Sequence, residues 1–245
     1  MSGHSHAKTV MATKMANDAK KGKIYSKYGR LITIAVKDGG GSGDPTKNSK
    51  LKTMIEQAKN VNMPKENIER AIKKGTGELA GESLEEVSFE GFGPGGIALV
   101  INGITDNTNR TLGEIRTILN QNNGKLAGEG AVRWMFEKKG SIILNIKNQE
   151  PAIQKDELEM TAIEAGAEDT SWNEDEFNIF VKPEELEQVK KSLEEKGIKI
   201  EAAVMDFVAK ETVELNEKEK EQSQRLFDAL DDNDAVNDIY SNIKN

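Results

Sequence analysis

The stretch DTSWNEDEFNIFV, residues 169–181, contains two short strand patterns separated by an acidic pair. Further patterns enclose it, at residues 141–147 (strand), 155–165 (helix), 183–196 (helix) and 199–208 (strand). The resulting order strand, helix, strand, strand, helix, strand is that of the ferredoxin-like split βαβ arrangement. The sequence therefore predicts a ferredoxin-like domain over residues 139–210.

A second α/β pattern lies on both sides of the first. Strand patterns at residues 87–92 and 97–104 flank the turn sequence GPGG. A helical pattern at residues 109–122 and a strand pattern at 132–137 follow, and the tail adds a helix at 217–230 and a strand at 235–243. We infer that the tail completes a discontinuous α/β domain of ferredoxin-like type, made of residues 77–138 plus 211–245, into which the domain of residues 139–210 is inserted.

Residues 1–76 form a helical unit in this interpretation. Apolar residues recur at helical spacing from Ile24 through Tyr28 to Ala35, and the glycine-rich run at residues 38–45 ends that helix. A second helix begins after Asn48 as its cap, and a third extends over residues 64–75, with proline at its start and glycine at its end. The fold class is thus α+β: a three-helix domain followed by two ferredoxin-like α/β domains, the third inserted in the second. The glycine-rich segment at residues 75–81 is expected to act as a hinge.

The charge of the chain is divided unevenly between these parts. Residues 1–74 carry 16 Lys and Arg against 6 Asp and Glu, a net charge of +10, whereas the remainder is at −18 and the whole chain at −8. A segment this basic attracts phosphate backbones, and an acidic remainder repels them. The chain is therefore expected to orient its N-terminal part toward a nucleic acid, DNA or ribosomal RNA.

One stripe of the first helix concentrates this charge. Lys20, Lys23, Lys27 and Arg30 follow a 3, 4, 3 spacing, offset by one residue from the apolar stripe. Lysines neutralise phosphates without reading bases, so affinity for shape and charge is expected. Tyr28 is interpreted as a core residue, and Tyr25 is left open between the core and a base-stacking role. The predicted nucleic-acid-binding residues are Lys14, Lys20, Lys21, Lys23, Lys27 and Arg30.

A polar segment, TDNTNR at residues 105–110, marks a second possible site. It stands where a strand pattern hands over to a helical one, so Asn or Asp caps are expected there. Asn107, Asn109 and Arg110 nevertheless supply more polarity than one cap requires. A structural cap and a functional polar site remain equally weighted alternatives.

Composition limits the other classes of function. The chain has no cysteine, and its two histidines, His4 and His6, lie in the N-terminal arm, so neither a catalytic residue nor a metal ligand is predicted and no cofactor is expected. No apolar run is long enough for a membrane span, and we expect a cytoplasmic monomer that contacts no membrane. A Mg²⁺-dependent nuclease, using acidic clusters at residues 174–176 or 231–234, and a protein-binding adaptor are the alternatives.

Several sequence motifs together resemble those of a known family. They are GHS at residues 3–5, DAKKGKIYSK at 18–27, NMPKENIERAIKKGTGE at 62–78, FEGFGPGGIA at 89–98, TDNTNRT at 105–111 and FEKKG at 136–140. In this order they resemble the YebC/PmpR-type family of transcriptional regulatory proteins and related translational activators. The resemblance implies a three-domain layout and a regulator that binds DNA, or alternatively a ribosome-associated factor that relieves stalled translation by binding RNA.

The N-terminal arm departs from the pattern of that family. Where the family reads approximately GHSKWANIKHRK, this chain has GHSHAKTVMATK, with Ala7 at the tryptophan position and Met11, Ala12 and Thr13 in place of basic or histidine residues. Stacking and phosphate contacts carried by those positions are in doubt. The binding surface is therefore expected on the helix that begins near Lys20.

Overall fold

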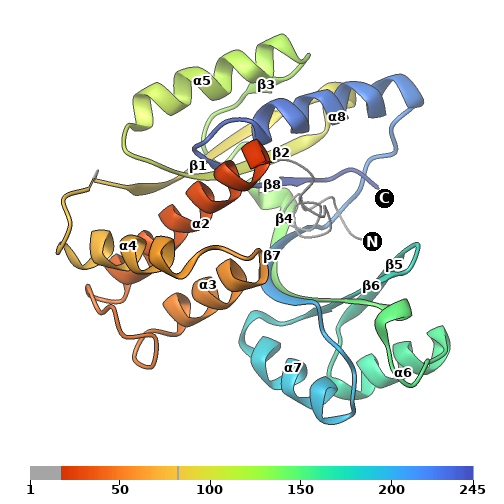
Figure 1. The fold of residues 1–245 in the computed structure, drawn as a ribbon. Helices are drawn as coiled ribbons and strands as arrows, with labels where there is room; N and C mark the ends of the chain where they lie inside the picture. The colour runs from red at the N-terminus through yellow and green to blue at the C-terminus, as the bar shows by residue number, and fades with distance from the viewer. Residues whose placement is uncertain (1–17, 82, 245) are drawn as a thin grey trace. The chain divides into compact units, whose positions relative to one another are not determined.

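The structure is a computed structural model that describes residues 18–81 and 83–244, without the side chains of residues 18–20. Its N-terminal part contains three helices, α2 (Asp18–Asp38), α3 (Ser49–Asn60) and α4 (Lys65–Thr76), coloured red to orange in Figure 1. One core joins them, with the buried side chains Tyr28, Ile32, Ala35, Val36, Leu51, Ala58, Met63, Ile68 and Ala71. The predicted apolar stripe is thus the buried face of α2.

The ends of these helices follow local chemistry. Asn48 caps α3 as predicted, because its side-chain oxygen accepts a hydrogen bond from the backbone N–H of Leu51 at 3.0 Å. The predicted ends of α4 are wrong by one or two residues. Pro64 lies before the first helical residue, and Gly77, with φ of 83°, ends the helix in the left-handed conformation in place of Gly75.

Gly75 lies inside α4 because two helices meet there. A Cβ atom at this position would stand 2.6 Å from Cβ of Val36 and 2.9 Å from the carbonyl oxygen of Thr33, both on α2. Only glycine allows the backbones of α2 and α4 to come so close. The sequence signal at Gly75 thus reflects packing, not termination.

The first sheet has the order β3-β1-β2-β8 and builds the middle part of the chain. Its members are β1 (Glu85–Phe92), β2 (Ala98–Thr105), β3 (Lys125–Leu126) and β8 (Val236–Ser241). The GPGG turn joins β1 and β2 as an antiparallel hairpin, as predicted, with a short 3₁₀ turn at Pro94–Gly96. Two helices, α5 (Thr108–Gln121) and α8 (Glu217–Asp231), pack on this part and contact each other.

The second sheet has the order β5-β6-β4-β7. Its strands are β4 (Phe136–Asn145), β5 (Asp169–Asn173), β6 (Glu176–Val181) and β7 (Ala202–Ala209). Two helices, α6 (Lys155–Ala165) and α7 (Leu186–Glu195), supply Leu158, Val189 and Leu193 to its core. With the first strand and the third strand of the domain adjacent at the centre, this is the ferredoxin-like order. The α+β fold class, with N-terminal helices and two α/β sheets, is therefore confirmed.

The strand boundaries before this domain were predicted wrongly. The sequence indicated separate strands at residues 132–137 and 141–147, whereas β4 is one continuous strand that follows a short 3₁₀ turn at Arg133–Met135. The interruption in the pattern is the charged segment of Glu137, Lys138 and Lys139. These residues remain in the strand because they pair with β7, in the register Lys138↔Phe207.

The described residues divide into two compact units. One contains residues 132–215 and 240–244, and the other contains the three N-terminal helices, the rest of residues up to 131, and residues 216–239. The helical part and the C-terminal helix α8 thus belong to the same unit. None of the helices in the described part of the chain is long and apolar enough to cross a membrane.

Candidate nucleic-acid interface

The lysine stripe lies on α2, beside the face that packs against α3 and α4. Ile32 and Ala35 are fully buried, whereas Lys23 is exposed and Lys27 and Arg30 are half-buried. The one-residue offset seen in the sequence therefore separates an apolar face from a basic face, as helical geometry requires. The helix presents its cations without disturbing the three-helix core.

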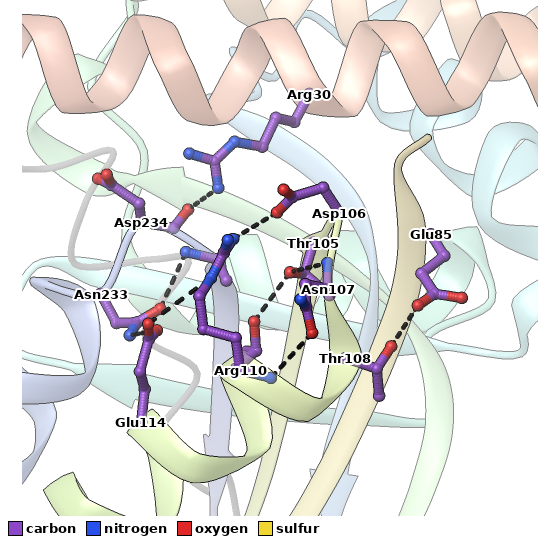
Figure 2. A network of polar contacts seen from close by, with 12 residues as sticks. Arg30, Glu85, Thr105, Asp106, Asn107, Thr108, Arg110, Glu114, Asn233 and Asp234 are labelled. Carbon is purple, nitrogen blue, oxygen red and sulfur yellow. Dashed lines mark hydrogen bonds and ion pairs between the residues drawn. The ribbon is translucent and has the colours of Figure 1, made fainter. Parts of the chain in front are cut away.

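Two residues of the stripe contact the segment that follows α8. The Nζ atom of Lys23 lies 2.6 Å from Oδ1 of Asp232, and this hydrogen bond raises the pKa of the Lys23 ammonium group. The guanidinium group of Arg30 donates a hydrogen bond to the backbone carbonyl of Asp234 (Figure 2). Lys23 and Asp232 are 209 positions apart in the sequence, and Arg30 and Asp234 are 204 positions apart. The fold brings both pairs together at this surface.

The charge of Lys27 acts on two further carboxylates of the same region. Burial raises the pKa of Asp231 to about 6, and the charge of Lys27 counteracts this rise. Burial also raises the pKa of Asp238, again against the charge of Lys27. Tyr28 lies next to them, and its own burial, together with the charge of Asp238, raises its pKa to about 12. The basic stripe of α2 therefore faces an acidic surface within the same unit.

The remaining predicted binding residues lie at the start of the described chain. Lys14 is outside the described residues, and of Lys20 only the backbone, in the first turn of α2, is described. Lys21 is half-buried and has an interaction partner. The structure thus brings Lys23, Lys27 and Arg30 together on one face and gives no geometry for Lys14.

Tyr25, which the sequence left open, has a structural role. Its hydroxyl group donates a hydrogen bond to the carbonyl of Asn62 at 2.9 Å, and its ring packs against the helical core. Tyr28 is a core residue, 8% exposed, as predicted. Neither ring is presented as an open stacking platform.

A second group of cations, on α3 and α4, was not among the predicted binding residues. Lys52, Lys59, Arg70, Lys73 and Lys74 are exposed, and the ion pairs of the described chain include none of them. Lys50, by contrast, contacts Asp38 and lies 3.0 Å from Glu86. The sequence did contain a signal for this group. Arg70, Lys73 and Lys74 are three and four residues apart, so they lie on neighbouring parts of one helical surface.

The polar segment before α5 forms a cap and a small ion network (Figure 2). Asn107 is the N-cap of α5, since its side-chain oxygen accepts a hydrogen bond from the backbone N–H of Arg110 at 3.0 Å. Arg110 contacts Asp106, which lowers the pKa of that carboxyl group, and lies 3.8 Å from Glu114. Asn109 is exposed. Capping and pairing thus account for Asn107 and Arg110.

The same network continues into the segment after α8. The side-chain amide of Asn233 donates to Glu114 at 2.9 Å, and its oxygen accepts from the backbone N–H of Ala235 at 2.9 Å. The residues between α8 and β8 are therefore held on the middle domain by α5. They form a fixed surface opposite α2.

One residue of each acidic cluster considered for a metal is held in an ion pair with a lysine. Asp232 pairs with Lys23, and Asp175 pairs with Lys147. Among the residues that the structure describes, no three His, Cys, Asp or Glu side chains form a group suited to a metal ion. The best-defined feature of chemical interest is thus the basic face of α2 with its acidic counterpart.

These features define a class: a small α+β protein with a basic helical module and acidic α/β modules. Two family models match the chain, the TACO1/YebC protein N-terminal domain over residues 5–78 and the TACO1/YebC second and third domain over residues 84–243. The chain belongs to the TACO1/YebC family, a family of regulatory proteins.

Close relatives cover the whole chain. A protein of Thermoanaerobacter pseudethanolicus named as a probable transcriptional regulatory protein is 46% identical, with 100% of this chain and 97% of the relative aligned. One of Geobacter sulfurreducens with the same description is 43% identical, over 99% of this chain and 95% of the relative. The crystal structure of a conserved hypothetical protein from Aquifex aeolicus matches with a TM-score of 0.83 and 42% identity, covering 96% of this chain and 95% of that one.

Proposed function

We propose that this protein is a non-enzymatic, cytoplasmic regulator of gene expression that binds the phosphate backbone of nucleic acid through its helical domain. The observation that carries the proposal is the concentration of charge, a net +10 in residues 1–74 against −18 in the remainder. The names of the relatives as probable transcriptional regulatory proteins support the same conclusion. The binding surface is the basic face of α2, with Lys14, Lys20 and Lys21 preceding Lys23, Lys27 and Arg30.

The exposed cations of α3 and α4 supply further positive charge on the same helical domain. Lys52 and Lys59 on α3, and Arg70, Lys73 and Lys74 on α4, belong to the same helical domain and are exposed to a ligand. Most of these cations are lysines, which contact phosphates as point charges and carry little base information. The protein therefore binds nucleic acid by charge and shape.

A non-enzymatic role agrees with the chemistry of the described carboxylates. One carboxylate of each acidic cluster, Asp232 and Asp175, is paired with a lysine. A Mg²⁺-dependent nuclease needs carboxylates with an open position for the metal and its water. Asp232 and Asp175 are instead engaged in contacts within the protein.

The test is the salt dependence of binding by Lys23→Ala, compared with Lys218→Ala. Lys218 is an exposed lysine at the start of α8 and provides a control for the loss of one positive charge. We expect Lys23→Ala to reduce the salt slope of log affinity by about 0.9 on duplex DNA or about 0.7 on single-stranded RNA, because one phosphate contact is lost. Lys218→Ala should leave the slope unchanged.

Both variants are measured on a random duplex and on a single-stranded RNA, with circular dichroism as the check on folding. Weaker binding of all sequences alike supports backbone contact. Equal slopes for Lys23→Ala and Lys218→Ala on every substrate would exclude α2 as the binding surface. Cleavage of either substrate in the presence of Mg²⁺ would contradict the non-enzymatic role.

A further inference from the structure

We propose that the acidic segment after α8 is an autoinhibitory latch, which occupies the basic face of α2 and must be displaced before nucleic acid binds there. The latch consists of Asp232 and Asp234 in this segment, together with Asp231 at the end of α8 and Asp238 in β8. This inference rests on the proposed function and adds its regulation. It predicts that the free protein holds its own binding surface closed.

Contacts are made at two positions of the stripe. Lys23 pairs with the carboxylate of Asp232, and Arg30 donates to the carbonyl of Asp234. Lys27, between them in the sequence, is the cation that acts on Asp231 and Asp238. Two of the three described stripe cations thus contact the latch, and the charge of the third acts on it. The spacing that suits a phosphate backbone is here matched by acidic side chains and a backbone carbonyl.

Competition follows from the donor groups involved. An ammonium group that donates to a carboxylate at 2.6 Å must exchange that contact for a phosphate oxygen when nucleic acid arrives. The apparent affinity is then reduced by the fraction of molecules in which the latch is closed. The latch thereby acts as an internal competitor of the same charge as the ligand.

The contact is strong enough to form and weak enough to open. The side chains of Lys23 and Asp232 are 49% and 77% exposed, and exposed ion pairs contribute little to stability because water and salt screen them. The part nearer Lys27 is less accessible, with Tyr28 and the neighbouring carboxyl groups partly or fully withdrawn from water. Opening therefore breaks an exposed ion pair at Lys23 and uncovers the less accessible groups near Lys27.

The fold allows the two sides to separate without unfolding either one. The core of the helical domain is made by α2, α3 and α4 themselves. The latch is fixed on the other side, where Asn233 contacts Glu114 of α5 and the backbone of Ala235. The two sides are joined through the glycine-containing connection after α4, where Gly77 has a positive φ.

The first experiment neutralises the latch and measures affinity. Asp232→Asn with Asp234→Asn should raise affinity for a random 20-base-pair duplex about twofold to fivefold, because the first change removes one exposed ion pair and the second removes a negative charge that acts on Lys23. The matched control is Glu217→Gln with Glu221→Gln. This control removes two negative charges at the opposite end of α8, including an exposed pair of Glu217 with Lys220. It reports the general effect of net charge.

A double-mutant cycle separates the latch from the proposed function. In the closed molecule Lys23 is shared with Asp232, so Lys23→Ala should weaken binding more strongly when Asp232 and Asp234 are already neutralised. If Lys23→Ala weakens binding but the latch variant binds no better than the charge control, the latch is wrong and the proposed function stands. If Lys23→Ala has no effect in either background, both are wrong.

The second experiment follows the latch directly in the unmodified protein. A carbodiimide activates a carboxylate, and a nearby lysine amine then forms an amide bond while one carboxylate oxygen leaves as part of the urea by-product. Lys23 and Asp232 should therefore yield a crosslinked peptide in the mass spectrum. Oligonucleotides without terminal phosphates avoid a competing reaction. The crosslink yield should fall as the duplex saturates the protein, in parallel with binding. A yield that stays constant at saturation would overturn the latch.

Discussion

The cations of α2 and those of α4 have the same chemistry and different surroundings. Lys73 and Lys74 on α4 are exposed, whereas Lys23 on α2 is paired with Asp232 and Lys27 lies beside two partly withdrawn carboxyl groups. The two helices pack against each other and belong to one domain. Their difference shows that the charge pattern of a helix identifies a cationic face, but the contacts made by the rest of the chain decide whether that face is open.

The largest effect is expected where the two helices touch. Gly75→Ala should destabilise the protein by about 1 to 3 kcal/mol, because the added Cβ would meet Val36 at 2.6 Å in a packed core. It should also weaken binding at both faces, since both depend on the pairing of α2 with α4. Urea denaturation measures the free energy of unfolding.

The matched control is Gly22→Ala in α2, where an added Cβ would meet nothing within 4 Å. We expect this variant to be more stable by about 0.5 to 1 kcal/mol, because alanine has the higher helix propensity. Equal behaviour of the two variants would show that the close approach of α2 and α4 is wrong.

The next effect distinguishes the open face from the latched one. Lys73→Ala with Lys74→Ala should reduce the salt slope on duplex DNA by about 1.8, since two phosphate contacts are lost. This reduction should be the same whether or not Asp232 and Asp234 are neutralised, unlike the effect of Lys23→Ala. Fluorescence anisotropy across salt measures it. A dependence of the α4 effect on the latch would mean that the two faces are not separate.

A smaller effect on stability is expected at Tyr25, which tests whether its ring belongs to the core or to the binding surface of α2. Tyr25→Phe should cost about 0.5 to 1 kcal/mol of stability through the lost hydrogen bond to the carbonyl of Asn62. Tyr25→Leu should keep the affinity for nucleic acid within about twofold, whereas loss of a stacked base would cost about 1 to 3 kcal/mol of binding. A tenfold loss of affinity in Tyr25→Leu, with the fold intact, would assign the ring to the binding surface.

A further effect is a pH dependence within the latch. The pKa of Asp231 is raised to about 6 by burial, with Lys27 of α2 opposing the rise and Asp228, Asp232 and Asp238 adding to it. The folded state therefore holds this proton more tightly than the unfolded state. Its contribution to stability is greatest below the ordinary aspartate pKa and is lost as pH rises through about 6.

Comparison with Asp231→Asn isolates that contribution from the other titrating groups. The stability of the variant relative to the wild type should increase between pH 4.5 and pH 7.5, because only the wild type acquires a charge at this position. Urea denaturation at the two pH values provides the measurement. A difference that does not change with pH would contradict the raised pKa.

Local patterns predicted those parts of the fold that depend on local sequence. The helix at residues 155–165 and the strands at 169–173 and 176–181 have the predicted boundaries, because apolar periodicity and turn residues coincide there. The two-residue strand β3 carries no such pattern. The charged residues inside β4 concealed its continuity, since their partner strand lies more than 60 positions away.

The candidate site was predictable in part for the same reason. The position of the basic face followed from the one-residue offset between Lys27 and Tyr28, which is a local property of a helix. The pairing of Lys23 with Asp232 joins residues 209 positions apart. The opposite net charges of residues 1–74 and of the remainder favour attraction between them. No periodicity in the sequence, however, indicates that Lys23 pairs with Asp232.

The most direct measurement is the mapping of crosslinks between the intact chain and nucleic acid. Formaldehyde crosslinking to duplex DNA and to a structured RNA, in separate reactions, followed by mass spectrometry of the attached peptides, locates the contact surface. The account predicts attachment at Lys20–Lys27 of α2 and at Lys73 and Lys74 of α4, with more attachment on α2 when Asp232 and Asp234 are neutralised. Attachment confined to the ferredoxin-like domain of residues 139–210 would contradict it.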